Sequence, residues 1–413
     1  MGAGRFLIVT WEGGGNIPPA IALGYQLNQV GHDVRLLGPY SAAREVNAAG
    51  LRFVPYASVP AWPDGVSLED DISLFGTLLN GDGVVRDVVA EARRDRPDVL
   101  VVDCMMGSAL AAGEYLGVPT AVLVHVLYRP FADQWGQLVV SPVPRARLGL
   151  ESVDGPVPAS LLARAAAVLV LVPPGFDFGA GDCPANTTYT GPVFLPDPSE
   201  YVWDPPGLPG SSDPLVLVSF GITRQRQRQA LAPVLQALAD LPVRGLLTLG
   251  GVLPPDEVAA PPNVTVRAYL PHAAVLRHGS LVVSHGGLST IMAALAHAVP
   301  LLCLPQGREQ GLNAERVEAV GAGRTLAMDS DPADIAAAVS EMIHDPAYRS
   351  SAAQNGGANR PHRRPRGTAR PVAAPLKTVT CPHMGLTPRQ ELIGNGPSWI
   401  LVTSGPAGVI VLP

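Results

Sequence analysis

The stretch that decides the fold runs Leu281-Val282-Val283-Ser284-His285-Gly286-Gly287-Leu288-Ser289-Thr290 and continues as Ile291-Met292-Ala293-Ala294-Leu295-Ala296. Its first four residues are apolar or small and predict a short buried strand, and the two glycines allow a tight turn into a helix. Such a turn points free N–H groups and the positive end of a helix dipole at one spot, which attracts phosphate. His285 adds a hydrogen-bond donor there, and it carries charge if a bound anion raises its pKa.

A second polar cluster follows the next predicted strand, residues 300–305. Glu309, Gln310 and Asn313 gather at the beginning of another predicted helix, where polar side chains can bind hydroxyl groups. The two clusters together predict a site for a diphosphate beside a polyol.

Residues 263–313 resemble the donor-sugar signature of the nucleotide-diphospho-sugar glycosyltransferases of natural-product and antibiotic biosynthesis, the actinobacterial UDP/dTDP-glycosyltransferase type. The resemblance is strongest at His285-Gly286-Gly287, Ser289-Thr290 and Glu309-Gln310. It covers roughly residues 5 to 345. It implies an α/β protein of the GT-B type, with two Rossmann-like domains that face each other across a cleft. It also implies an inverting, hexosyltransferase-type enzyme that takes a UDP- or dTDP-sugar as co-substrate and needs no metal or other cofactor.

The composition fits a two-domain protein that buries large cores. The chain has 413 residues, of which 47% are hydrophobic and 15% are charged. A net charge of −6 without a stripe of Lys and Arg argues against nucleic acid as a partner. The four cysteines follow no metal-ligand spacing, and Cys104 and Cys303 are expected to be buried free thiols.

No stretch is long enough for a transmembrane helix, and the first apolar run, residues 6–10, is too short for a signal peptide. We therefore expect a soluble cytoplasmic protein with no membrane partner. A homodimer is compatible with the resemblance.

Strands alternate with helical stretches along the first half of the chain. Strands are expected over residues 5–10, 32–38, 97–103 and 119–125, and a helix over residues 18–30. This alternation predicts a doubly wound parallel sheet, in which ligands bind beyond the carboxyl ends of the strands. Asn16, Asp103 and His125 all fall at such ends.

The domain boundaries follow from composition. Seven prolines between residues 191 and 214 predict a linker. The alternation of strands and helices restarts at residue 215. We therefore expect an acceptor-binding domain over residues 1–190 and a nucleotide-sugar-binding domain over residues 215–350. Residues 355–413 lack an apolar period and are expected to be irregular, either disordered or the product of a frame shift.

The resemblance assigns roles on the donor side. The residues that it places around the diphosphate, the base and the sugar are His285 with Gly286 and Gly287, Ser289 and Thr290, Ser219 and Thr223 of the Ser-Phe-Gly-x-Thr turn, Tyr269 and Leu270, and Glu309 and Gln310. Fixed donors at these positions would stabilise the charge that develops on the leaving diphosphate. Ordinary helix capping is the alternative role for His285.

The acceptor side departs from the family pattern, Gly-His-x-x-Pro, whose His is the base. Here the matching residues are Gly15-Asn16-Ile17-Pro18-Pro19, and an Asn cannot take up a proton at neutral pH. Asp103 matches the Asp that orients that base. The candidate bases are therefore Asp103 itself, His125 and Glu12, although His125 could instead be a satisfied histidine that lines the pocket.

Aromatic residues in the first half are expected to line a pocket for a small hydrophobic or aromatic aglycone. They are Trp62, Phe75, Tyr128, Phe131 and Trp135, and the alternative for each is ordinary helix packing.

Two other readings stay open. A catalytically impaired homologue would bind nucleotide-sugar or assist another glycosyltransferase, as Asn16 favours. A sugar-nucleotide epimerase would share the architecture. An NAD-dependent dehydrogenase is disfavoured, because residues 12–16 do not fit Gly-x-Gly-x-x-Gly.

Overall fold

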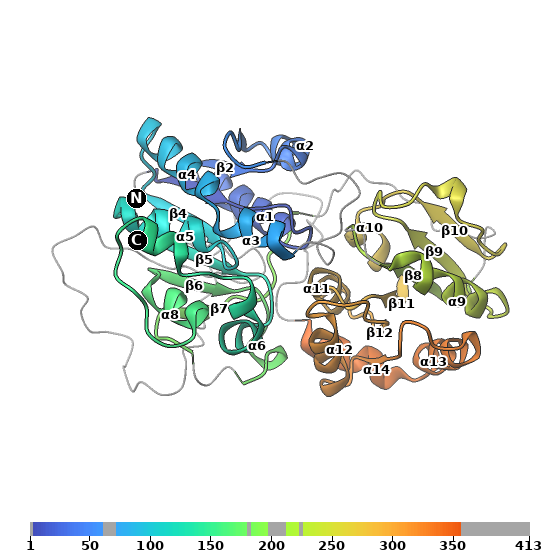
Figure 1. Cartoon of the computed structure of the whole chain (residues 1–413). Coiled ribbons are helices and arrows are strands. Elements are labelled where there is room, and N and C mark those ends of the chain that lie inside the picture. Colours follow the sequence, from blue (N-terminus) through green and yellow to red (C-terminus); the bar gives the residue numbers. More distant parts are fainter. Residues whose placement is uncertain (1–2, 61–71, 180–182, 197–211, 223–225, 357–413) are drawn as a thin grey trace, which may run out of the picture. The chain divides into compact units, whose positions relative to one another are not determined.

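The computed structural model describes residues 3–60, 72–179, 183–196, 212–222 and 226–356, except for the side chains of residues 72–75 (Figure 1). The contacts divide the chain into two compact units, and the division falls between Leu195 and Pro196. This division lies within the predicted linker, residues 191–214, most of which is outside the described residues.

The first unit contains a seven-stranded sheet in the order β3-β2-β1-β4-β5-β6-β7, in which every neighbouring pair is parallel. The strands are β1 Arg5–Val9, β2 Asp33–Gly38, β3 Arg52–Pro55, β4 Val99–Asp103, β5 Thr120–Val124, β6 Ala167–Val170 and β7 Thr187–Tyr189. The strand order reverses between β1 and β4, and such a switch point leaves a crevice at the carboxyl ends of the strands. The segments that follow β1, β4 and β5 therefore come together.

Helices connect these strands. They are α1 Ile17–Gln29, α2 Ala43–Ala48, α3 Ile72–Asn80, α4 Asp82–Arg94, α5 Gly107–Leu116, α6 Tyr128–Asp133, α7 Val143–Arg147 and α8 Val157–Arg164, with 3-10 turns η1 Tyr40–Ala42, η2 Trp135–Leu138 and η3 Pro174–Phe176. Prolines occupy the first turn of α1, where a missing N–H costs little. Gly31 follows that helix with φ of 94°, a conformation that glycine adopts without strain.

The second unit contains a six-stranded parallel sheet in the order β10-β9-β8-β11-β12-β13. Its strands are β8 Leu215–Ser219, β9 Arg244–Thr248, β10 Val264–Arg267, β11 Gly279–Ser284, β12 Leu301–Cys303 and β13 Gly323–Thr325. Its helices are α9 Gln227–Ala239, α10 His272–Leu276, α11 Leu288–Ala296, α12 Gln310–Ala319, α13 Pro332–His344 and α14 Pro346–Asn355, with the 3-10 turn η5 Pro255–Glu257. Here β8 and β11 adjoin at the switch point.

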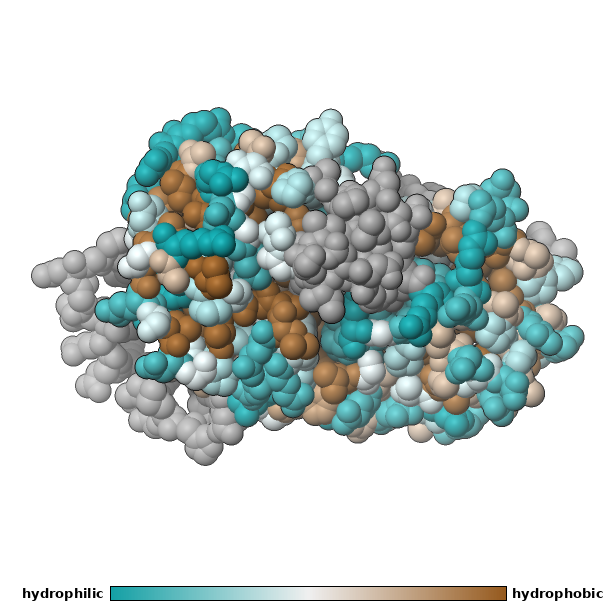
Figure 2. Space-filling model, in the orientation of Figure 1, coloured by the Kyte–Doolittle hydropathy of each residue, from teal (hydrophilic) through white to brown (hydrophobic). Residues whose placement is uncertain are grey.

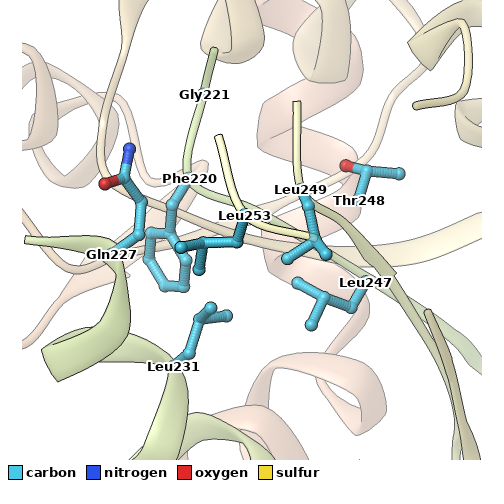
Figure 3. Close-up of a pocket in the computed structure, with 8 residues that line it drawn as sticks. All are labelled: Phe220, Gly221, Gln227, Leu231, Leu247, Thr248, Leu249 and Leu253. Carbon is cyan, nitrogen blue, oxygen red and sulfur yellow. The ribbon is translucent and has the colours of Figure 1, made fainter. Parts of the chain in front are cut away.

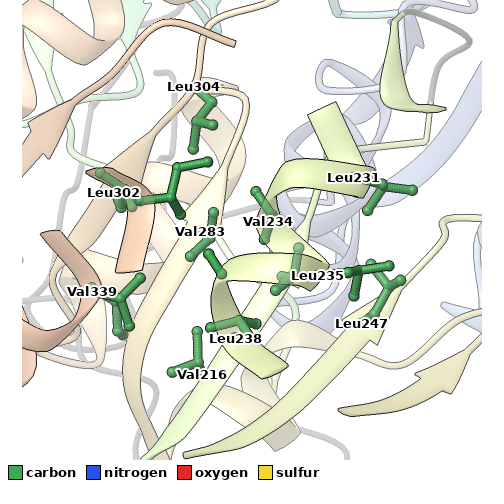
Figure 4. Packing of buried hydrophobic residues seen from close by; sticks show 14 of the residues in the cluster. Val216, Leu231, Val234, Leu235, Leu238, Leu247, Val283, Leu302, Leu304 and Val339 are labelled. Atoms are coloured by element: carbon green, nitrogen blue, oxygen red, sulfur yellow. The ribbon is translucent and has the colours of Figure 1, made fainter. Parts of the chain in front are cut away.

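Each unit has its own hydrophobic core. In the second unit, side chains of β8, β9, β11 and β12 pack against α9 and α13, as Figure 4 shows for Val234, Leu238, Val283, Leu302 and Val339. In the first unit, α1 packs against β1, β2 and β4 through residues such as Ile8, Ile21 and Leu36. In Figure 2 the surface over α4 is largely hydrophilic. This is the exposed side of the helix, opposite its buried residues. No helix of the described ranges has the length and apolar character needed to cross a membrane.

The doubly wound α/β architecture predicted from the sequence is confirmed. Gly287, rather than Ser289 or Thr290, is the N-cap of α11. Asp331 is the N-cap of α13, but its side chain makes no capping hydrogen bond. The last described helix, α14, ends at Asn355, and the predicted irregular segment lies outside the described residues from residue 357 onward.

Candidate functional site

The predicted catalytic residues of the first unit come together at the carboxyl ends of β4 and β5. Asp103 is the last residue of β4, and His125 directly follows β5. His125 Nδ1 lies 2.8 Å from Asp103 Oδ2. The Asp103 side chain is 4% exposed and the His125 side chain is 12% exposed. A carboxylate that accepts from Nδ1–H leaves the lone pair of the imidazole on Nε2.

The other oxygen of Asp103 is also occupied. Trp11 Nε1 and the backbone N–H of Met105 each donate to Oδ1 at 3.0 Å. Both carboxylate oxygens therefore accept hydrogen bonds from the protein, and the side chain is held in one orientation. Trp11 was not among the predicted site residues, although it lies only two residues after the end of β1.

The side chain of Asn16 forms hydrogen bonds within its own loop. Its Nδ2 donates to Thr10 Oγ1 at 2.8 Å and to the Trp11 carbonyl at 2.9 Å, and its Oδ1 accepts from the Gly13 N–H at 3.2 Å. The side chain is 2% exposed. These contacts hold the Trp11–Asn16 turn closed, so a role of Asn16 in orienting an acceptor stays a prediction. Glu12, the third candidate base, is exposed in the same turn.

A glycine is required inside this turn. A Cβ on Gly13 would lie 2.5 Å from the Trp11 ring and 2.7 Å from Asn16 Oδ1. The glycine therefore lets the indole fold back towards Asp103.

Cys104 completes a cluster with Asp103 and His125, whose ligand atoms lie within 4.8 Å of one another in a set that could hold a metal ion. Cys104 Sγ lies 3.9 Å from His125 Nδ1. Burial raises the pKa of the Cys104 thiol well above its usual range, so the sulfur is a neutral thiol. Because the Asp103 oxygens and His125 Nδ1 bond one another and their neighbours, the arrangement fits a hydrogen-bonded pair better than a metal centre. Cys104 and Cys303 are buried free thiols, as predicted.

The predicted aromatic residues behave differently from one another. Phe131 is fully buried and Tyr128 is 2% exposed, so both pack within the unit. Burial is also the main reason why the pKa of Tyr128 rises to about 12. Trp135 is half-buried and meets Phe131 edge-on, with ring centroids 5.1 Å apart. Trp62 and the side chain of Phe75 lie outside the described residues, and contact of any of the five with an acceptor stays a prediction.

In the second unit, His285 lies in the turn from β11 to α11 and packs between two glycines. A Cβ on Gly221 would lie 3.0 Å from the imidazole, and one on Gly287 would lie 2.6 Å from Nε2. Gly286 has φ of 84°, and its N–H donates to Ser284 Oγ. The two turns after β8 and β11 therefore approach each other as closely as the imidazole allows.

His285 is neutral in this environment. Burial lowers its pKa to about 4, while a hydrogen bond with the Ser219 backbone opposes the shift. Its Nδ1 is buried and has no hydrogen-bond partner among the described residues. A buried polar atom without a partner is costly, so this atom is suited to a group that binds beside the turn.

Ser219, at the end of β8, has a partner that was not predicted. Its Oγ lies 3.2 Å from His272 Nε2, at the beginning of α10. Desolvation lowers the pKa of His272 to about 4. No motif around His272 signals this pairing, because the histidine simply follows Pro271.

The other predicted donor residues are placed as follows. Ser289 is exposed and Thr290 is buried in the first turn of α11, while Tyr269 is 60% exposed beside the buried Leu270. Thr223 lies outside the described residues. A small pocket lies beside the turn after β8, and its apolar side chains point towards one another (Figure 3). It is lined by Phe220, Gly221, Gln227, Leu231, Leu247, Thr248, Leu249 and Leu253.

The polar cluster at α12 divides between an exposed and a buried part. Gln310 is 2% exposed, and its Oε1 accepts from the Gln306 N–H at 2.8 Å. Asn313 Nδ2 donates to the Gly286 carbonyl at 3.0 Å and so ties α12 to the glycine turn. Glu309 is half-buried as the N-cap of α12. Glu309 is therefore better placed than Gln310 to meet a ligand hydroxyl.

Comparisons with known proteins show what this chain is similar to in sequence. Residues 232–370 match the family described as Erythromycin biosynthesis protein CIII-like, C-terminal domain. The chain is 27% identical over 405 residues to 4'-demethylrebeccamycin synthase of Lentzea aerocolonigenes, covering 86% of this chain and 95% of that protein. It is 27% identical over 403 residues to L-demethylnoviosyl transferase of Streptomyces niveus, covering 91% and 99%.

The fold is also similar to that of solved glycosyltransferases. The solved glycotransferase of kitacinnamycin superposes with a TM-score of 0.70 at 25% identity, covering 86% of this chain and 94% of that one. The chain is a GT-B glycosyltransferase.

In this glycosyltransferase the two sets of polar residues belong to different units. The Asp103–His125 pair is at the strand ends of the first unit, and the His285 turn is at those of the second. The family match includes His285, whereas Asp103 and His125 lie outside it.

Proposed function

We propose that this enzyme transfers a sugar from a UDP- or dTDP-sugar to a small hydrophobic or aromatic natural product, with inversion at the anomeric carbon. The observation that carries the proposal is the His285-Gly286-Gly287 turn, packed against Gly221 at the amino end of α11. The N–H groups at the amino end of α11 supply fixed donors for the charge that a diphosphate carries, and the imidazole beside them has a nitrogen without a hydrogen-bond partner among the described residues.

The proposed transfer requires a base for the acceptor and stabilisation of the leaving diphosphate. The acceptor oxygen attacks the anomeric carbon from the face opposite the diphosphate and loses its proton to a base, while the nucleoside diphosphate leaves. In this proposal the second unit stabilises the leaving group, and Glu309, the half-buried N-cap of α12, holds sugar hydroxyls. The first unit supplies the acceptor contacts and the base.

We propose that the transfer does not depend on a metal ion. The N–H groups at α11 and the neutral His285 provide stabilisation that a divalent cation would otherwise supply. In the described part of the second unit, His, Cys, Asp and Glu side chains form no group of three that could hold a metal. We also propose that the protein acts in the cytoplasm.

The test is a transfer assay with UDP- and dTDP-sugars against a panel of phenolic and alcoholic polyketides, with and without EDTA. The expected product carries the sugar with inverted anomeric configuration, read from the coupling constant of the anomeric proton, at a rate that EDTA leaves unchanged. Retained configuration would contradict the inverting mechanism, and loss of activity in EDTA would contradict metal independence.

One observation favours a second function. Asn16 stands where the family's base is expected, and its amide is used within its own turn. A homologue without a base would bind nucleotide-sugar or assist another glycosyltransferase. Such a protein would bind the nucleoside diphosphate but release no product with any acceptor.

A further inference from the structure

We propose that His125 is the general base of this glycosyltransferase and that Asp103 is its positioning residue. The inference rests on the proposed transfer reaction and names the group that takes the acceptor's proton. It is carried by the juxtaposition of the two side chains at the ends of neighbouring strands.

The backbone brings the pair together. β4 and β5 are parallel neighbours in the register Asp103 to Leu123, so His125 lies just beyond the strand end at which Asp103 stands. The segment after His125 is also held, because the Tyr128 N–H donates to Asp177 Oδ2 at 2.9 Å. Strand pairing before the histidine and this hydrogen bond after it hold the backbone on both sides of His125.

The hydrogen bond defines what each residue can do. Asp103 Oδ2 accepts from His125 Nδ1–H, so Nε2 is the nitrogen that can take a proton. When it does, the Asp103 carboxylate beside Nδ1 stabilises the imidazolium that forms. The acceptor O–H bond breaks, its electron pair forms the new bond to the anomeric carbon, and the proton goes to Nε2.

Asp103 is poorly placed to be the base itself. Oδ1 accepts hydrogen bonds from Trp11 and Met105, and Oδ2 accepts one from His125. Donors of the protein therefore already occupy both carboxylate oxygens. Its 4% exposure also leaves an acceptor little access, whereas the imidazole reaches the surface of the unit.

The neighbouring groups do not compete for the role. Asn16 has no basic atom, and its amide holds the Trp11 turn. Cys104, 3.9 Å from Nδ1, is a neutral thiol because of its burial. Tyr56 donates its hydroxyl to the Thr10 carbonyl, and burial raises its pKa well above the usual range. Among these groups, His125 is thus the one with a basic side chain.

The test compares His125→Gln, Asp103→Asn and wild type on acceptors of graded acidity, from an aliphatic alcohol to a nitrophenol. A Gln side chain can still donate to Asp103 but cannot take up a proton. We expect His125→Gln to lower kcat for the alcohol by about 100- to 10,000-fold, the contribution of a general base. The nitrophenol, which ionises without help, should lose far less.

Asp103→Asn should follow the same acceptor dependence with an unchanged KM for the donor, which a merely structural role would not produce. Added imidazole should restore part of the alcohol activity of His125→Ala. His344→Ala, at an exposed site on α13, is the matched control and should behave as wild type.

The outcomes separate the two proposals. If His125→Gln is folded and transfers to the alcohol within about threefold of wild type, the assignment of the base is overturned while the transferase function stands. An equal loss with alcohol and nitrophenol, without rescue by imidazole, would also overturn it. A wild type that turns over no donor at all would overturn the proposed function, and the base assignment with it.

Discussion

Trp11 Nε1 donates a hydrogen bond to Asp103 Oδ1 at 3.0 Å, joining two residues that are 92 positions apart in the chain. The loop after β1 thereby fixes the carboxylate at the end of β4, which in turn bonds His125 after β5. Three strand ends thus contribute to one buried chain of hydrogen bonds.

This relationship predicts the effect of Trp11→Phe. The ring would remain but its donor would be lost, so Asp103 would hold His125 less firmly. We expect kcat for alcohol acceptors to fall about tenfold, equivalent to about 1.4 kcal/mol at the transition state. Tyr348→Phe, which also removes a donor to a carboxylate but on the surface of the other unit, should leave the rate unchanged. Equal rates for both variants would disprove the link.

Asn16→Asp tests whether the amide is structural. A carboxylate of the same shape cannot donate to Thr10 Oγ1 or the Trp11 carbonyl, and it would face that carbonyl with negative charge. We expect the free energy of unfolding to fall by about 2 kcal/mol, measured by thermal melting. Asn47→Asp, on an exposed part of α2, should change it by less than about 0.5 kcal/mol. A stable Asn16→Asp protein would contradict this role.

His285→Ala should lower kcat/KM by about a hundredfold if the imidazole stabilises the leaving diphosphate. The close approach of Gly287 makes a sharper test possible. Gly287 has φ of −65°, which alanine adopts freely, so Gly287→Ala would act only by pushing the His285 ring, 2.6 Å from the new Cβ. In the His285→Ala background that clash disappears.

We therefore expect Gly287→Ala to weaken nucleoside diphosphate binding in the wild type but to add little to His285→Ala, as measured by calorimetry. Gly311→Ala, whose Cβ would meet nothing within 4 Å, is the control. Strictly additive losses would show that the two residues act independently.

The neutral His285 predicts a pH dependence of stability. Its pKa is about 4 in the folded protein, because of burial first and of the nearby Arg308 and His272 to a smaller extent. In the unfolded chain a histidine has a pKa of about 6.5, so the unfolded state binds more protons between these values. Stability should therefore fall as the pH drops from about 7 to 4, by about 3 kcal/mol in all for this residue.

His285→Gln should flatten that slope relative to wild type in thermal melts over the same pH range. A variant whose melting temperature falls as steeply as that of wild type would mean that other groups cause the dependence.

Glu114, in the first unit, carries a dependence of the same sign as that of His285, but at lower pH. Hydrogen bonds from Arg145, and then from Arg164, lower its pKa to about 2. The stabilisation is present above the usual carboxyl pKa and is lost as the pH falls towards 2. Glu114→Gln leaves the buried Arg145 without its charge partner and should cost about 3 kcal/mol at neutral pH. Glu257→Gln, in an exposed pair with Arg228, should cost less than about 1 kcal/mol in the same denaturation experiment.

The sequence predicted the sheets well because parallel strands are buried on both faces. Runs such as those of β4 and β11 are continuously apolar, and glycines or polar residues mark their ends. The rule that ligands bind at those ends then selected Asp103, His125 and His285. In the structure Asp103 ends β4, His125 directly follows β5 and His285 directly follows β11, as the strand pattern predicted.

The pairings between segments could not be read in the same way. Nothing near Trp11 signals a bond to Asp103, and nothing near His272 signals one to Ser219, because both depend on how side chains meet across the folded sheet. Asn16 and Gln310 were predicted to contact a ligand, but their side chains have structural roles. Each is polar and near a strand end, yet each bonds the backbone of its own loop. Residue type cannot separate a ligand contact from a structural one.

The measurement that tests the central claim most directly is a calorimetric titration of the purified protein with dTDP, UDP and, as a control, ADP. We expect one pyrimidine diphosphate to bind tightly and ADP weakly, with His285→Ala reducing the affinity for the former. A folded protein that binds none of the three, or that binds ADP as well as the pyrimidine nucleotides, would contradict the assignment of a nucleotide-sugar site to the second unit.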